Sequence, residues 1–307
     1  MIETFASVSL PIDEKYKLTK QRIQNGTSKK RICVVTGIHG DELEGQYVAY
    51  QLQQKIREVY DQLDGIVDIY PCMNPLGMDS IQRKVPMFDL DMNRIFPGDE
   101  DGSMVEYLAY CIIQDIKGAD LVIDIHASNA YLVELPQLRI NELFKEKLVP
   151  MSKWVNANFV WIHSTSTILE STLGYCLNKL NTPTLVLEMG IGSRLTLEYG
   201  ENSVQGLLNA MHQLGMLKNE YPVMEPIIGY DQEIRFLNAQ CAGLFISEME
   251  VNTPVKKGQV IGMIVDPLSG NKLCEVISDW DGLLFTIRKY PICNEGSLIG
   301  RILEGKQ

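Results

Sequence analysis

The sequence lacks the features that carry a protein to nucleic acid or into a membrane. Its 39 Asp and Glu residues outnumber 28 Lys and Arg residues, for a formal net charge of −11. A chain this acidic has no basic excess for phosphate backbones or anionic lipid. No apolar run reaches transmembrane length, and the start of the chain is too charged to resemble a signal peptide. We therefore expect no nucleic acid or membrane partner and a cytoplasmic location.

Paired cysteine motifs are absent, and histidine is sparse. The seven cysteines are scattered, and none forms the Cys-x-x-Cys pair of a zinc or redox motif. We expect free thiols in a reducing compartment. Only four histidines occur, and two of them, His39 and His126, close apolar runs. These two positions are therefore the first candidates for chemistry.

Strand and helix patterns alternate over the first two thirds of the chain. Short apolar runs predict strands over 31–38, 65–75, 119–128, 159–164 and 183–190. Apolar residues at three- and four-residue intervals predict helices over 42–60, 103–117, 171–180 and 202–217, with Ser103 as an N-cap. This alternation predicts an α/β domain with a mainly parallel or mixed sheet. Functional residues of such sheets gather past the carboxyl ends of the strands.

The pattern changes near residue 220. Residues 219–226, NEYPVMEP, predict a linker, and short strands separated by Gly, Pro, Asn and Asp follow. Residues 253–264 align with 291–302, and Gly258 and Gly296 fall at equivalent places. Two copies of a strand–turn–strand unit predict a small β-sandwich with internal symmetry.

Two domains are therefore expected: a catalytic α/β domain over 1–218 and a small all-β domain over 219–307 of the barrel-sandwich, lipoyl/biotinyl-like type. A carrier domain of that type needs a lysine at a hairpin tip, and the corresponding segment 278–285, SDWDGLLF, has none. We expect this domain to be structural, a wall of the active site or an oligomer contact.

His39 and Glu42 have a spacing that suits a metal ion. They lie at a predicted strand end and helix start, and zinc accepts such nitrogen and oxygen ligands together with a third protein ligand. His126 closes another strand and is the third candidate. Asp124, on the same face of that strand, is placed to hold its imidazole. His-x-x-Glu alone is common by chance, but two of four histidines at strand ends favour a metal site over two structural histidines.

Further candidates lie at another strand end and in a long loop. Glu188 closes the apolar run 183–190, where a carboxylate is costly to bury without a role, and a base is what a catalytic zinc site needs. The loop 74–98 offers Arg83, Asn93 and Arg94, and arginine binds carboxylates or an oxyanion. On composition alone, a solvated surface loop is as good an interpretation.

Four motifs in this order resemble the succinylglutamate desuccinylase/aspartoacylase family, a branch of the zinc carboxypeptidase-like group: GIHGDELEG, NPLGM…R…DLDMNRIFPG, DLVIDIHAS and LVLEMGIG. The resemblance implies a zinc carboxypeptidase-like α/β/α domain with a mixed sheet over 1–218, followed by the family's β-rich C-terminal domain. It also implies that His39, Glu42 and His126 bind one zinc ion per chain.

The same resemblance implies roles for residues around the metal. Glu188 would be the general base and then the general acid. Arg83 would polarise the scissile carbonyl, although the spacing from this arginine to the Asn-Arg pair varies within the family. Asn93 and Arg94 would hold the α-carboxylate of an N-acyl amino acid, and Arg194 is a further candidate for substrate contact.

Three functions remain open from the sequence. The first is a zinc-dependent hydrolase that cleaves the amide bond of a small N-acyl amino acid. The second is a zinc carboxypeptidase acting on short peptides, and the third is a non-enzymatic metal-binding or interaction module. His163 and His212 are interpreted as structural, although His163 also stands at a strand end. The acyl group, the amine part and a possible homo-oligomer are not specified.

Overall fold

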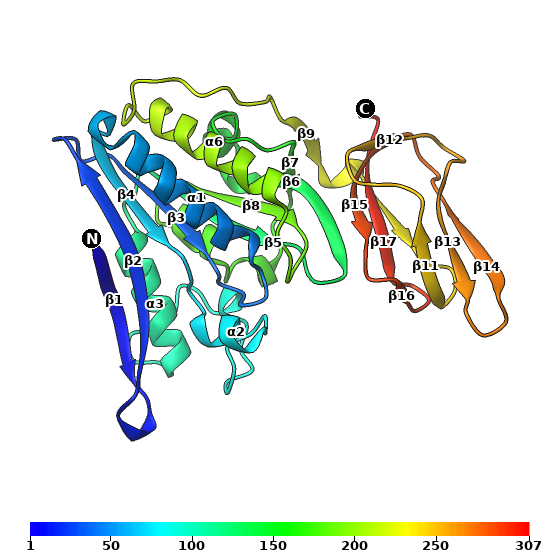
Figure 1. Cartoon of the computed structure of the whole chain (residues 1–307), viewed down its shortest axis with the longest axis horizontal. Coiled ribbons are helices and arrows are strands. Elements are labelled where there is room, and N and C mark those ends of the chain that lie inside the picture. The colour runs from blue at the N-terminus through cyan, green and yellow to red at the C-terminus, as the bar shows by residue number, and fades with distance from the viewer. Residues whose placement is uncertain (307) are drawn as a thin grey trace.

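The structure is a computed structural model that describes residues 1–306, apart from the side chain of Ile168. Helices cover both faces of a large sheet in the first part of the chain, and strands dominate the part after α6 (Figure 1). The helices are α1 (Glu44–Glu58), α2 (Pro75–Ser80), α3 (Met104–Ile116), α4 (Lys145–Ser152), α5 (Leu173–Lys179) and α6 (Leu197–Gln213). The strands are β1 (Ile2–Ser9), β2 (Lys15–Asn25), β3 (Arg31–Thr36), β4 (Gly65–Tyr70), β5 (Leu121–Ala127), β6 (Leu132–Asn141), β7 (Phe159–His163), β8 (Thr184–Gly190), β9 (Ile227–Tyr230), β10 (Ile234–Asn238), β11 (Gly243–Ser247), β12 (Thr253–Val255), β13 (Val260–Asp266), β14 (Asn271–Ile277), β15 (Gly282–Arg288), β16 (Ile292–Cys293) and β17 (Leu298–Glu304).

The large sheet is mixed, and its strand order brings the predicted site together. The order is β1-β2-β4-β3-β5-β8-β6-β15-β17-β10. Strand β3 pairs in parallel with β4 and β5, and β5 pairs in parallel with β8. Strands β2 and β6 run antiparallel to β4 and β8. Because β3, β5 and β8 run in one direction, their carboxyl ends meet at one edge of the sheet.

Two apolar cores hold the helices on the two faces of this sheet. Leu52 of α1 and Val204 of α6 belong to one core. Ile112 of α3, Leu177 of α5 and Leu18 of the N-terminal hairpin belong to the other. Each such fully buried aliphatic side chain contributes about 1.5–3 kcal/mol. The predicted α/β fold with a mixed sheet is confirmed.

Element ends follow local chemistry. Ser103 and Glu106 form the capping box that starts α3, and the Ser103 backbone N–H donates to the Glu106 carboxylate at 2.8 Å.

Strands β1, β2 and β6 were not expected. Charged and polar residues interrupt the apolar runs in these segments, so the strand signal is weak. In β2, for example, Lys15 and Lys17 are exposed while Tyr16 and Leu18 are buried.

Among the described residues after α6, the regular elements are strands and one short 3₁₀ turn, Asp231–Glu233. Strands β14, β13, β11 and β16 form a second sheet. Each copy of the sequence repeat gives one strand to each sheet, because β12 and β17 belong to the large sheet while β13 and β16 belong to the second. Gly258 and Gly296 both have positive φ, +85° and +79°, in the turns that precede β13 and β17. A left-handed backbone of this kind favours glycine. The lipoyl-like assignment itself stays a prediction.

The expected boundary at residue 218 does not interrupt the hydrogen bonding of the sheet. Strand β9 pairs in parallel with β7, and β15 pairs with the start of β6. Strand β6 therefore pairs with strands from both parts of the chain, and the division into two domains stays a prediction.

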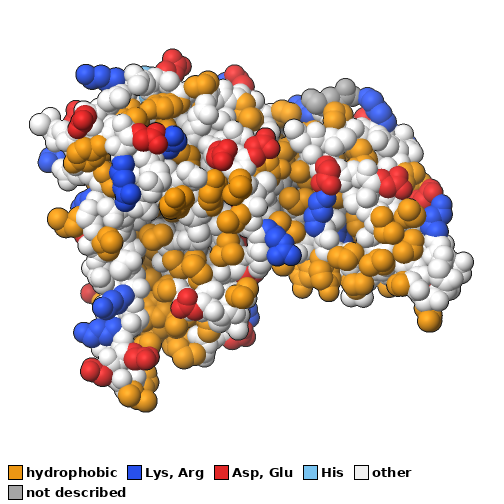
Figure 2. All heavy atoms as spheres, viewed as in Figure 1, with side chains coloured by type: hydrophobic (Ala, Val, Ile, Leu, Met, Phe, Trp, Pro, Cys, Tyr) orange, Lys and Arg blue, Asp and Glu red, His pale blue; other side chains and the backbone are white. Residues whose placement is uncertain are grey.

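On the face shown, acidic and basic side chains are interspersed rather than gathered in separate patches (Figure 2). None of the helices among residues 1–306 is both long and apolar enough to cross a membrane.

Candidate metal and catalytic site

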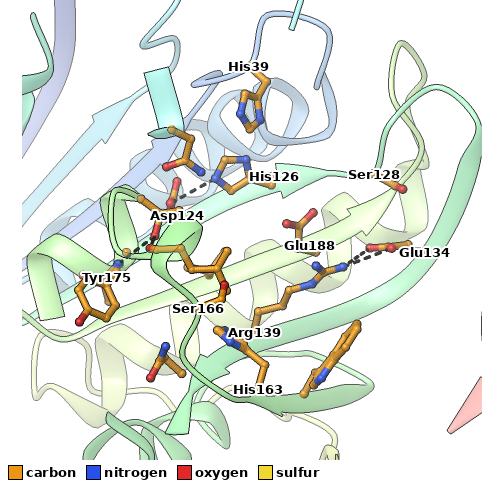
Figure 3. Close-up of a pocket in the computed structure, with 18 of the residues that line it drawn as sticks. His39, Asp124, His126, Ser128, Glu134, Arg139, His163, Ser166, Tyr175 and Glu188 are labelled. Atoms are coloured by element: carbon orange, nitrogen blue, oxygen red, sulfur yellow. Dashed lines mark hydrogen bonds and ion pairs between the residues drawn. The ribbon is translucent and has the colours of Figure 1, made fainter. Parts of the chain in front are cut away.

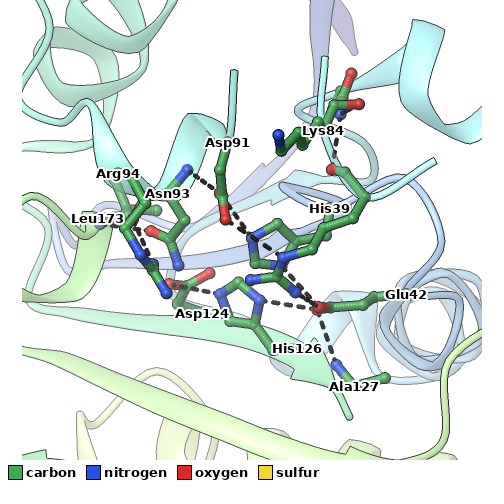
Figure 4. A network of polar contacts seen from close by, with 12 residues as sticks. His39, Glu42, Lys84, Asp91, Asn93, Arg94, Asp124, His126, Ala127 and Leu173 are labelled. Atoms are coloured by element: carbon green, nitrogen blue, oxygen red, sulfur yellow. Dashed lines mark hydrogen bonds and ion pairs between the residues drawn. The ribbon is translucent and has the colours of Figure 1, made fainter. Parts of the chain in front are cut away.

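Three side chains converge at the carboxyl edge of the sheet. His39 lies in the turn after β3, Glu42 lies just before α1, and His126 lies in β5. They are 2%, 4% and 3% exposed, and their possible ligand atoms all lie within 4.8 Å of one another. The topology thus brings together the three residues predicted as metal ligands (Figure 4).

Glu42 is the centre of this group. Its two carboxylate oxygens lie 2.7 Å from Nδ1 of His39 and 2.9 Å from Nδ1 of His126. The Ala127 backbone N–H also donates to it at 3.0 Å. Burial alone would raise the pKa of Glu42, but the two facing imidazoles hold that pKa well below its usual range. Glu42 is therefore an anion fixed between two nitrogen ligands.

The other nitrogen of each imidazole faces a carboxylate. Nε2 of His39 lies 3.0 Å from Asp91, and Nε2 of His126 lies 3.2 Å from Asp124. Asp124 was expected in this role, whereas Asp91 was not, because a loop residue about fifty positions from its partner leaves no pattern in the sequence. Carboxylates in such positions orient metal-binding histidines. Two imidazoles and one carboxylate, buried and converging, meet the donor set of a catalytic zinc site, which leaves a fourth position open.

Arg83 lies beside the three candidate ligands. Its Nη1 donates to Glu42 at 2.9 Å and its Nε donates to Asp91 at 3.3 Å. Its side chain is 39% exposed and, like the three candidate ligands, lines a cleft in the protein. The guanidinium is therefore held next to the metal ligands with part of its surface open to the cleft.

Asn93 and Arg94 come from the 3₁₀ turn Met92–Arg94 and also line the cleft. The Asn93 side-chain oxygen accepts from the Leu173 backbone N–H at 2.9 Å, which fixes the amide so that its NH₂ is the remaining polar group. Arg94 donates through Nη1 to the Asn93 carbonyl oxygen at 2.8 Å. Two donor side chains thus stand side by side near the ligands (Figure 4).

Glu188 stands next to His126 on the neighbouring strand. The two residues are cross-strand partners in the parallel β5–β8 pair, and Glu188 lines the cleft with its side chain half-buried. Burial raises the pKa of Glu188, although the charges of Arg139 and His126 oppose the rise. A carboxylate in this place can exchange a proton with a group held near the ligands (Figure 3).

The cleft has a volume of about 670 Å³ and extends beyond Glu188 to residues that the sequence did not single out. Arg139 of β6 and Trp161 of β7 are cross-strand partners, and the guanidinium lies 5.0 Å from the Trp161 ring centre. Arg301 of β17 and Glu134 of β6 complete this end of the cleft. Alternation along β6 was the available signal, but that strand was not expected.

The remaining candidates lie in different surroundings. Arg194 is exposed, donates only to the neighbouring Ser193 carbonyl oxygen among the described residues, and does not line the cleft. His163 does line it, and its Nδ1 lies 3.0 Å from the Ser164 carbonyl oxygen. His212 lies on α6 with its Nδ1 3.1 Å from the Leu217 carbonyl oxygen.

Comparisons with known proteins agree with the motifs. The family model of the succinylglutamate desuccinylase/aspartoacylase catalytic domain matches residues 28–214. A relative from Halomonas elongata, named N-alpha-acetyl-L-2,4-diaminobutyric acid deacetylase, is 28% identical over 278 residues, which cover 87% of this chain and 80% of the relative.

Solved structures share the fold. A succinylglutamate desuccinylase/aspartoacylase from Rhodobacter sphaeroides superposes with a TM-score of 0.82 at 20% identity, over 99% of this chain and 95% of that one. An ectoine utilization protein from Ruegeria pomeroyi gives 0.81 at 20% identity, over 97% and 92%. A metallo-carboxypeptidase from Burkholderia cenocepacia gives 0.55 at 15% identity, over 70% and 64%. The α/β core is therefore also similar to that of a metallo-carboxypeptidase.

Proposed function

Because the chain belongs to the succinylglutamate desuccinylase/aspartoacylase family, we propose that it is a zinc-dependent hydrolase that cleaves the amide bond of an N-acyl amino acid. The observation that carries the proposal is the set of side chains in one cleft. Three buried candidate ligands, a neighbouring carboxylate and three donor side chains line it together. Metal-assisted amide hydrolysis uses the ligands, the base and an oxyanion donor, and the other donors can bind a substrate carboxylate.

His39, Glu42 and His126 would hold one zinc ion per chain. Bound zinc supplies Lewis-acid activation of water and of a carbonyl oxygen. Asp91 and Asp124 keep the two imidazoles oriented from outside the ligand set.

The protein's own groups then move the proton and bind the charges. Glu188 takes a proton from the attacking water and later returns it to the leaving nitrogen. Arg83, beside the ligands, donates to the carbonyl oxygen as negative charge develops on it. The free amide NH₂ of Asn93 and the guanidinium of Arg94 bind the α-carboxylate of the substrate.

Two observations favour a small amide over a peptide. The relative from Halomonas elongata is named a deacetylase. Arg301 and Asp231, from the part of the chain after α6, also line the cleft, so this part of the chain can form a wall against long peptides. The carboxypeptidase alternative predicts rates that rise with peptide length, whereas deacylation predicts the highest rates with N-acyl amino acids. The complete set of ligands and base counts against a non-enzymatic module.

The direct test is Glu188→Gln, assayed by release of primary amine from a panel of N-acyl amino acids. The amide cannot accept the proton, so we expect a loss of about 10²–10⁴-fold in kcat with unchanged zinc content. Glu198→Gln, an exposed change on α6, serves as the matched control and should keep the wild-type rate. If Glu188→Gln retains most of the wild-type rate, Glu188 is not the base.

A further inference from the structure

Glu44 is a buried carboxylate near the site that the proposed reaction does not use. It is the first residue of α1, two positions after the candidate ligand Glu42, and it is fully buried. An acidic side chain in the first turn of a helix is ordinarily solvated, and burying one is costly. The described lining of the cleft does not include Glu44, so this side chain does not contact the substrate itself.

The partner of Glu44 is the loop 190–196, which joins β8 to α6. Its two oxygens accept from the Thr196 backbone N–H at 3.1 and 2.9 Å. The carboxylate also fills the space beside Gly190, where a Cβ atom would lie 1.9 Å from Oε1. Burial raises the pKa of Glu44, and hydrogen bonds from Thr196 and Ile191 oppose that rise. The carboxylate therefore lies between the two ends of the loop and is held by its backbone.

The same loop is bonded to the turns that carry the candidate ligands. The Ser193 backbone N–H donates to the Asp41 carbonyl oxygen at 2.7 Å, in the turn after β3. The Gly192 backbone N–H donates to the Asn129 carbonyl oxygen at 3.2 Å, just after β5. Helices α1 and α6 lie side by side behind these turns (Figure 1). The loop thus ties the carboxyl ends of β3, β5 and β8 together, with the Glu44 side chain packed inside it.

The carboxyl end of β8 has incomplete support from the sheet. Glu188 is held on one side by the parallel pairing of β8 with β5. On the other side the register shifts between Glu134 and Gln137, so β6 has one residue more than β8 over this stretch. Such a bulge interrupts the ladder, and Pro136 inside it has no N–H to donate. Contacts outside the sheet must therefore fix the end of this strand.

The proposed base lies close to this contact. Glu188 comes two residues before Gly190, which is roughly 7 Å along an extended strand. A carboxylate that takes a proton from water must be placed accurately, because an error of about 1 Å in the position of a reacting group can cost about 100-fold in rate. A shift at the end of β8 would reach Glu188 directly.

We propose that Glu44 is a positioning residue that holds Glu188 in register with the candidate metal ligands through the loop 190–196. It acts through the base and touches neither substrate nor metal. The inference rests on the proposed function, because only that reaction uses Glu188 as a base.

Glu44→Gln tests the proposal in the zinc-loaded protein with the panel of N-acyl amino acids. The amide keeps the size of the side chain, but either orientation turns its NH₂ towards a backbone N–H of the loop. We expect kcat to fall by about tenfold or more, with KM within about twofold and zinc content unchanged. Glu58→Gln, at the exposed end of the same helix where Glu58 pairs with Lys55, is the matched control and should keep the wild-type kcat. A wild-type kcat in folded, zinc-loaded Glu44→Gln overturns the proposal, whatever its Tm.

A double variant separates positioning of the base from a general loss of structure. If Glu44 acts through Glu188, then Glu44→Gln should lower kcat by no more than about twofold in a Glu188→Gln background. The same loss in both backgrounds would mean a purely structural role and would overturn the proposal. If Glu44→Gln does not fold, Glu44→Asp replaces it with the same expected pattern, because it keeps the charge but withdraws the oxygens from the loop.

Hydrogen exchange separates this inference from the proposed function. If the wild-type protein hydrolyses none of the panel, the proposed function fails for this class, and the contact is then tested without turnover. Glu44→Gln should speed the exchange of the backbone amides over 187–190 by about tenfold, while the amides of β4 keep their wild-type rates. Unchanged exchange over 187–190 overturns the role of Glu44.

Discussion

Gly190→Ala is a sharp test of how the strand that carries Glu188 is fixed in place. Gly190 ends β8 with φ +66°, two residues after the proposed base. A Cβ atom here would lie 1.9 Å from Oε1 and 2.7 Å from Cδ of Glu44. Glu44 is fully buried at the start of α1 and accepts twice from the Thr196 backbone N–H, at 2.9 and 3.1 Å. The substitution therefore acts on the backbone and on a buried carboxylate at once.

Two effects add up in this variant. A left-handed backbone costs an alanine about 1–2 kcal/mol. The Glu44 carboxylate can rotate away from the new methyl group, but it then leaves Thr196 while its charge stays buried. Losing a hydrogen bond to a charged group costs about 1.5–3 kcal/mol. We expect Gly190→Ala to lower the free energy of unfolding by about 2.5–5 kcal/mol and to lower Tm by about 4–8 °C.

The assay is urea and thermal unfolding, with Gly118→Ala as the matched control. Gly118 has φ +79° and open space around its missing Cβ, so it isolates the backbone effect, about 1–2 kcal/mol. In a Glu44→Ala background the clash is absent, and Gly190→Ala should there cost no more than Gly118→Ala does. Equal losses for Gly190→Ala and Gly118→Ala in the wild-type background would refute the reasoning.

Two further predictions concern ligands. Treatment with a chelator should abolish amide hydrolysis, and added zinc should restore it. His126→Ala should lose its activity and also its zinc, which elemental analysis measures. A fully active protein without metal would contradict the metal site. Arg94→Ala should raise KM by about tenfold or more because it removes a charged contact to the substrate carboxylate. Arg194 is exposed and lies outside the cleft, so Arg194→Ala should leave KM within about twofold. A larger increase in KM for Arg194→Ala than for Arg94→Ala in steady-state kinetics would exchange their roles.

Several features of this protein were predictable because their causes are local in the sequence. The capping box of Ser103 and Glu106 sets the start of α3. Apolar runs that end in His126 and Glu188 predicted strands with polar side chains at their ends, and the structure places both residues in neighbouring strands. The glycines at 258 and 296 predicted turns, and both have positive φ. Each of these signals needs only a few consecutive residues.

Only the tertiary structure decided which of the candidate groups meet. The sequence names His39 and His126 at strand ends and Glu42 at a helix start, and the parallel order of β3, β5 and β8 brings strand ends far apart in sequence to one edge. Asp91 joins His39, and Arg301 joins Glu134, across 52 and 167 positions respectively. Contacts of that kind depend on strand order and register, which arise from packing the whole chain into one core rather than from any local pattern of residues.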